Sequence, residues 1–144
     1  MNGAAMAVSI LMIEDDEGHA RLIERNLKRA GVSNDVTHFT SGTAAMRFLL
    51  APERPRGAPL LILLDLNLPD MSGIDILARL KADDQLRLAP VIILTTTDDE
   101  REIRRCYELG ASVYITKPVN YEAFAKAIQQ LGLFLAVIQV PPSP

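Results

Sequence analysis

The sequence has little cysteine, little net charge and no long apolar stretch. Its single cysteine, Cys106, excludes an internal disulfide framework and is typical of proteins from a reducing compartment. A net charge of −3 provides no general attraction to nucleic acid or anionic lipid. No apolar run approaches the roughly 20 residues that a membrane-spanning helix needs, and residues 1–7 lack the basic region of a secretion signal. We therefore expect a cytoplasmic protein whose partners include neither nucleic acid nor membrane.

Short apolar segments alternate with helical patterns along the chain. Three nearly unbroken apolar runs are typical of strands buried on both faces, and two weaker runs complete the set: residues 8–13, 60–64 and 91–94, then 35–40 and 112–116. Apolar residues recur at helical spacing after each run. Strand–helix alternation repeated five times predicts a doubly wound α/β fold, with a five-stranded parallel sheet and helices on both faces.

We treat the 144 residues as one domain with three parts. Residues 1–7 form a flexible leader, residues 8–131 the α/β core and residues 132–144 an apolar C-terminal extension. An apolar extension of this kind either packs on its own domain or contacts a partner. Of these two interpretations we favour the partner.

Polar residues stand where predicted strands end, among them Glu14, Asp15 and Asp65. Because the carboxyl ends of parallel strands meet at one edge of a sheet, we expect these side chains to share one site. Three clustered carboxylates repel one another unless a cation neutralises them, and oxygen ligands suit magnesium. The alternative for the residues after the first strand is a solvated acidic turn in which Asp16 or Glu17 favours the start of the next helix.

Lys117 and Thr95, at the ends of two further strands, distinguish a bare metal site from phosphoryl chemistry. A lysine ammonium is a mobile point charge that suits a phosphoryl oxygen, and a threonine hydroxyl can donate to another. Each residue also has an ordinary interpretation. Lys117 can form an ion pair with Asp65, and Thr95 can help to cap the next helix.

Five motifs in this order resemble the receiver domain of two-component response regulators: Glu14-Asp15, Asp65-x-x-x-Pro69-x-x-x-Gly73, Thr95-Thr96, Tyr114 and Lys117-Pro118. The resemblance covers the chain from about Val8 to Leu131. It implies a flavodoxin-like (βα)5 fold and a signalling role. Such a domain accepts a phosphoryl group from a histidine kinase in a Mg²⁺-dependent reaction, catalyses only its own phosphorylation and dephosphorylation, and signals through protein contacts.

The resemblance also implies how the acceptor and the metal are held. Asp65 matches the phosphoacceptor of the family. Asp15 would bind Mg²⁺ directly, and Glu14 would act mostly through water. Asn67 would contribute its backbone carbonyl to the metal.

The remaining motif residues take switch roles by the same resemblance. Thr95 and Lys117 would bind phosphoryl oxygens, and the Tyr114 ring would turn into the space that Thr95 vacates. Asn67 and Thr97 would tune the lifetime of the phosphorylated state. The bond from Lys117 to the proline after it would be cis, an isomer that only an X-Pro bond adopts at low cost.

The loop style and the apolar tail are similar to stand-alone receivers that partner phytochrome-type histidine kinases. That likeness implies a homodimer through the face of the fourth helix, fifth strand and fifth helix and through the C-terminal extension. If the last helix continues through Gly132, apolar residues three and four apart would form a seam for that dimer: Tyr121, Phe124, Ile128, Leu131, Leu135 and Ile138.

Other functional classes fit the sequence less well. A haloacid dehalogenase phosphatase needs a second carboxylate two residues after its nucleophile, where this chain has Asn67. No glycine-rich phosphate loop follows a predicted strand, which argues against a nucleotide-binding protein. A phosphorylation-independent interaction module of receiver fold stays open as an alternative. His19 and His38 lack metal-ligand spacing, so we assign both to surface or helix-cap positions.

Overall fold

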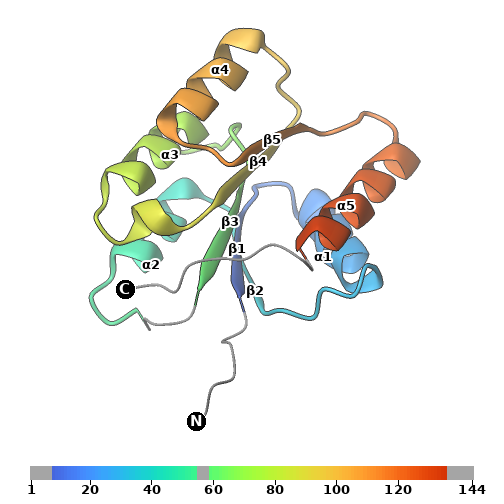
Figure 1. The fold of residues 1–144 in the computed structure, drawn as a ribbon, viewed down its shortest axis with the longest axis horizontal. Helices are drawn as coiled ribbons and strands as arrows, with labels where there is room; N and C mark the ends of the chain where they lie inside the picture. The colour runs from blue at the N-terminus through green and yellow to red at the C-terminus, as the bar shows by residue number, and fades with distance from the viewer. Residues whose placement is uncertain (1–7, 55–58, 136–144) are drawn as a thin grey trace.

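A five-stranded parallel sheet forms the centre of the molecule (Figure 1). The structure is a computed structural model that describes residues 8–54 and 59–135. The spatial strand order is β2-β1-β3-β4-β5, and every neighbouring pair is parallel. The strands are β1 (Ser9–Ile13), β2 (Val36–Phe39), β3 (Leu60–Leu64), β4 (Val91–Thr95) and β5 (Val113–Thr116). The predicted doubly wound, flavodoxin-like α/β fold is confirmed.

The helices cover both faces of this sheet. Figure 1 shows α1 and α5 on one side, and α2, α3 and α4 on the other. Their bounds are α1 (Glu17–Arg29), α2 (Gly42–Leu50), α3 (Gly73–Ala82), α4 (Glu100–Leu109) and α5 (Tyr121–Leu135), with a 3-10 helix η1 (Leu86–Leu88) before β4. None of the helices in the described ranges is long and apolar enough to cross a membrane.

Alternation along the strands divides the core into two layers. On β1, Leu11 and Ile13 pack under α2 and α3, whereas Ile10 and Met12 pack under α1 and α5. Every residue of β3 and of β4 is buried. Strands covered on both faces need apolar residues at every position, which explains the unbroken runs in the sequence.

Capping residues set several helix ends. The Ser41 hydroxyl accepts the Ala44 N–H at 3.2 Å at the start of α2, and Asn120 accepts the Ala123 N–H at 3.1 Å at the start of α5. Gly110 ends α4 with a φ of 111°, a left-handed conformation that favours glycine.

The last helix continues through Gly132, which lies against α1. A Cβ atom at this position would lie 2.5 Å from the Cβ of Ala30, so glycine allows the two helices to approach closely. The seam assigned to a dimer packs here on the domain's own core: Phe124, Ile128 and Leu131 are buried in the layer with α1. The expectation that these three face a second copy is wrong, because α1 covers the same stripe.

The rest of the apolar extension, residues 136–144, lies outside the described residues, as does the leader 1–7. Tyr121, the first position of the expected seam, is exposed, and Leu135 packs partly against the layer with α1. Within the described part of the extension, the large apolar side chain of Leu133 is exposed.

Gly73, the first residue of α3, has no room for a side chain. Its Cβ would lie 2.5 Å from the Cα of Leu66 and 2.6 Å from the carbonyl oxygen of Asp65, both of which are backbone atoms. We predict that Gly73→Ala lowers the free energy of unfolding by about 2 kcal/mol, because the β3–α3 loop must shift. Urea titration measures this loss. Gly42→Ala is the comparison: it also begins a helix, but its Cβ meets the side chains of Met71 and Ile76 rather than backbone atoms. We expect a smaller loss there, and a loss as large as that of Gly73→Ala would contradict the argument.

Candidate functional site

Four buried polar side chains meet at the carboxyl edge of the sheet. Glu14 follows β1, Asp65 follows β3, Thr95 ends β4 and Lys117 follows β5. Their residues are only 2%, 6%, 0% and 4% exposed, respectively. Asp15 lies beside them but is exposed. The strand order therefore brings together the residues that the sequence predicted to share a site.

The Lys117 ammonium group holds three elements together. It donates to the carboxylate of Glu14, to Oδ2 of Asp65 at 2.9 Å and to Nδ1 of His19 at 3.1 Å. An ammonium group has three N–H donors, so these contacts use all of them. The ordinary interpretation of Lys117 as an ion-pair partner of Asp65 is thus correct in this structure, and it does not conflict with a phosphoryl role.

Asp65 is held as a charged carboxylate. Burial by itself raises its pKa, but hydrogen bonds from the Asn67 N–H, Lys117 and the Thr95 hydroxyl outweigh burial, and the pKa lies below its usual value. The Thr95 hydroxyl donates to Oδ1 at 2.7 Å, and the Asn67 N–H donates to the same oxygen at 3.0 Å. At neutral pH the Asp65 carboxyl is therefore ionised and held in a fixed orientation at the carboxyl edge of the sheet.

Glu14 behaves differently from Asp65 although both contact Lys117. Burial is the largest influence and raises the pKa of Glu14 to about 7, with the nearby charge of Asp65 acting in the same direction and Lys117 acting against it. One lysine cannot neutralise two buried carboxylates. Ligand oxygens of Glu14, Asp15 and Asp65 all lie within 4.8 Å of one another. Hard divalent cations prefer such oxygen clusters, so the donor set fits one.

The side chain of Asn67 connects two loops above the site. Its amide nitrogen lies 3.2 Å from the Thr97 hydroxyl and 3.4 Å from the hydroxyls of Thr95 and Thr96. The β3–α3 loop thereby contacts the β4–α4 loop directly beside Asp65. Substitutions at Asn67 or Thr97 would change the groups that surround this carboxylate.

Tyr114 lies on β5, half-buried between the sheet and α4. Its hydroxyl donates to the carbonyl of Thr97 at 2.6 Å, and its backbone N–H donates to the Tyr107 hydroxyl at 3.0 Å. Burial raises the pKa of Tyr114 to about 12, so the phenol stays a donor. Contacts therefore run without a break from Asp65 through Thr95, Asn67 and Thr97 to Tyr114. The sequence pattern did not indicate Tyr107, because an exposed helical tyrosine carries no signal of its own.

Both histidines lie closer to the site than expected. His38 contacts the backbone carbonyl of Glu14 through Nε2 at 2.7 Å. His19 contacts Lys117, and its ring packs on Phe124 of α5 with centroids 5.4 Å apart. The expected surface position of His19 is confirmed, since 38% of its side chain is exposed, but the expectation did not include its contact with Lys117. Its place in the first turn of α1, directly after the Glu14-Asp15 motif, was the signal that could have revealed it.

Two further features of the loops differ from the sequence expectations. No peptide bond in the described ranges is cis, so the bond between Lys117 and Pro118 is trans. The cis expectation for this bond is wrong here, and the two isomers of an X-Pro bond differ by only about 0.5–1 kcal/mol. Asp70, which no sequence motif singled out, accepts the backbone N–H groups of Gly42 and Thr43 at 3.0 and 2.7 Å. It thereby ties the loop after Asp65 to the start of α2.

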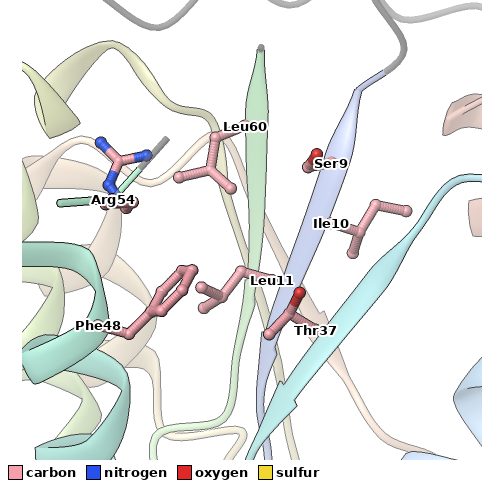
Figure 2. A pocket seen from close by; sticks show the side chains of 7 residues that line it. All are labelled: Ser9, Ile10, Leu11, Thr37, Phe48, Arg54 and Leu60. Carbon is pink, nitrogen blue, oxygen red and sulfur yellow. The ribbon is translucent and has the colours of Figure 1, made fainter. Parts of the chain in front are cut away.

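A separate hollow of about 140 Å³ lies at the opposite ends of the strands (Figure 2). The residues that line it include the first residues of β1 and β3: Ser9, Ile10, Leu11, Thr37, Phe48, Arg54 and Leu60. None of the strand-end polar residues described above belongs to this lining. The strand-end cluster and this hollow are therefore distinct features of the domain.

Known proteins share both the sequence pattern and the fold. The response regulator Rcp1 of Synechocystis sp. is 35% identical over 135 residues, which is 92% of this chain and 92% of that protein. The Mn²⁺-bound form of Rcp1 superposes with a TM-score of 0.83 at 34% identity, over 93% of this chain and 98% of the other.

Two other solved structures are similar over nearly their whole length. The response regulator receiver domain from Rhodospirillum rubrum has a TM-score of 0.90 at 60% identity and covers 95% of this chain and 99% of its own. The phosphorylated cyanobacterial phytochrome response regulator RcpA has a TM-score of 0.84 at 33% identity, with the same two coverages of 95% and 99%.

A family model agrees with these similarities. The model for the response regulator receiver domain matches residues 10–129, which include every strand-end residue of the site. Because this match spans most of the chain and the relatives exceed 30% identity over nearly all of it, the chain belongs to the response regulator receiver domain family.

Proposed function

We propose that Asp65 accepts a phosphoryl group from a sensor histidine kinase. The observation that carries this assignment is an ionised carboxylate held by Thr95 and Lys117 at the carboxyl edge of the sheet. One Asp65 oxygen attacks phosphorus while the bond from phosphorus to the donor breaks. For a phosphohistidine donor, the electron pair of that bond goes to the imidazole nitrogen. The chain catalyses only this transfer and the later hydrolysis of its own acyl phosphate.

Thr95 and Lys117 supply the groups that stabilise the transferred phosphoryl oxygens. Phosphoryl transfer depends on positioning and charge stabilisation more than on covalent help from the protein. A hydroxyl donor and an ammonium group already contact opposite oxygens of Asp65, so small movements bring both to a phosphoryl group bound there.

Glu14, Asp15, Asp65 and the backbone carbonyl of Asn67 would hold a Mg²⁺ ion. The cluster of three carboxylates and the raised pKa of Glu14 support this proposal, as does the Mn²⁺-bound form of the relative Rcp1. When bound, the ion neutralises negative charge on the phosphoryl oxygens and the carboxylates. Asp15, the exposed member of the set, is the one open to an ion that arrives from solvent.

Tyr114 reports the state of Asp65 in this proposal, and Asn67 and Thr97 tune how long the phosphoryl group remains. The contacts from Asn67 to Thr97, and from Thr97 to the Tyr114 hydroxyl, support a link between the site and the face of α4, β5 and α5. A phosphoryl group changes the population of Tyr114 orientations only as far as it interacts differently with them.

Partner choice follows from the relatives and from the exposed apolar residues. RcpA is a phytochrome response regulator, which supports a phytochrome-type histidine kinase as the phosphoryl donor.

Three exposed apolar residues lie on the face of α4, β5 and α5. Tyr107 is on α4, Val119 follows β5 and Tyr121 begins α5. We include in the proposal a homodimer through this face, with the C-terminal extension taking part.

The first functional prediction concerns the acceptor. With Mg²⁺ and a small phosphodonor such as acetyl phosphate, the protein gains the mass of one phosphoryl group, and Asp65→Asn gains none because the amide is not a nucleophile. Intact-mass spectrometry measures the uptake. Asp98→Asn, which removes an exposed carboxylate from the β4–α4 loop, keeps full uptake as the matched control. Labelling of Asp65→Asn would refute the assignment, and an unlabelled wild-type protein would favour the phosphorylation-independent interaction module.

The second prediction concerns the metal and follows from the Glu14 carboxyl, whose pKa burial raises to about 7. Below that pH the metal-free carboxyl carries a proton that the ion must displace. Mg²⁺ affinity therefore falls as the pH falls, by roughly tenfold between pH 8 and pH 6. Titration calorimetry at the two pH values measures this ratio. Glu14→Gln binds more weakly at both and loses most of the pH dependence; an unchanged ratio in that variant would contradict the role of Glu14.

The third prediction concerns the dimer. Val119 is fully exposed and Tyr121 is 63% exposed, so a charge at Val119 changes no contact within the core. We expect Val119→Asp to shift the molar mass measured by light scattering from a dimer toward a monomer, because the charge would be buried at the interface. Leu50→Asp, at an exposed apolar residue on α2, is the control and leaves the mass unchanged. A dimer that survives Val119→Asp while Leu50→Asp dissociates it would place the interface elsewhere.

A further inference from the structure

His19 makes a contact with the site that the proposed roles do not use. Its Nδ1 atom lies 3.1 Å from the Lys117 ammonium nitrogen, across 98 residues of sequence. Because an ammonium group only donates, Nδ1 must be the acceptor, and the ring proton then sits on Nε2. Oδ2 of Asp16 lies 3.9 Å from the same Nδ1 atom, which is too far for a hydrogen bond.

We propose that His19 is a positioning residue for Lys117 and holds its ammonium group in place during phosphoryl transfer. This inference rests on the proposed function of Asp65. Lys117 has three acceptors: the carboxylates of Glu14 and Asp65, and the neutral ring of His19.

The reaction draws on two of these three acceptors. The Asp65 carboxylate becomes an acyl phosphate, loses its charge and becomes a weaker acceptor. The Glu14 carboxylate would share its charge with a bound Mg²⁺ ion. The His19 nitrogen takes part in neither change, so it keeps its hydrogen bond while another N–H of Lys117 turns from Asp65 to a phosphoryl oxygen. A lysine held on one side in this way loses less rotational freedom when it turns.

The orientation of the His19 ring is itself determined by its surroundings. Its backbone N–H is capped by Oδ1 of Asp16 at 2.9 Å, at the start of α1. Its ring packs on the buried Phe124 ring with an interplanar angle of 60°. The contact between α1 and α5 thus points Nδ1 toward Lys117, and the site is tied to α5 as well as to α4.

Two substitutions separate the acceptor from the ring. His19→Phe keeps an aromatic ring against Phe124 but has no acceptor. His19→Asn loses the ring but can place its side-chain oxygen where Nδ1 lies. We expect the rate of phosphoryl uptake from acetyl phosphate with saturating Mg²⁺ to fall about tenfold in His19→Phe, the size of effect that loss of one charge-assisted hydrogen bond produces. His19→Asn recovers most of that rate.

A second measurement does not depend on phosphorylation. In ¹⁵N NMR spectra of the unphosphorylated wild-type protein, the Lys117 ammonium resonance is shifted by the contact with His19. We expect it to move in His19→Phe and to stay near its wild-type position in His19→Asn. Thermal unfolding of each variant verifies that the fold is intact.

The outcomes distinguish the two proposals. If wild-type protein takes up no phosphoryl group, the proposed function of Asp65 fails and this inference fails with it. If wild-type protein is labelled and His19→Phe reacts at the same rate, only the role of His19 is overturned. A slow His19→Asn beside a normal His19→Phe would also overturn it, since ring packing would then be the cause.

Discussion

The rest of the site depends on a buried lysine placed between two buried carboxylates. Lys117 reaches Glu14 and Asp65 from the end of the last strand, and all three residues are nearly inaccessible to solvent. Buried charges are stable only when they are paired. One ammonium group facing two carboxylates leaves an excess of negative charge. Burial, with a smaller contribution from the charge of Asp65, raises the pKa of Glu14 to about 7. The protein's own groups therefore balance the charge of the cluster only in part, and a bound divalent cation would complete the balance.

Most of the fold and the central site could be predicted because parallel α/β sheets impose strong local patterns. β3 and β4 are buried on both faces, so their residues form unbroken apolar runs, and the short length of these runs favours strands over buried helices. Once five strands alternate with helices, the residues after each strand must meet at one edge. For that reason the amino-acid pattern alone was enough to place Asp65 beside Lys117, although 52 residues separate them in the chain.

The parts that could not be predicted depend on contacts between helices. An apolar stripe at helical spacing does not say whether it faces its own domain or a second copy, and the stripe of Phe124 and Ile128 packs on α1. Gly132 looked like a weakness in the helix but provides the space that Ala30 requires. His19 was indistinguishable from a surface residue, because its partners come from the end of β5 and from α5, about a hundred residues away.

The contacts that would transmit a signal exist without any phosphoryl group. The Thr95 hydroxyl already donates to Asp65, and the Tyr114 hydroxyl already donates to Thr97. In the proposed mechanism, a phosphoryl group on Asp65 would draw the Thr95 hydroxyl from the carboxylate to a phosphoryl oxygen, and it would therefore act on contacts that already link Asp65 to Tyr114. Each such hydrogen bond is worth only about 1 kcal/mol net, so the arrangement competes closely with others. A switch of this kind works by a shift in populations, and its sensitivity comes from the small difference between the two states.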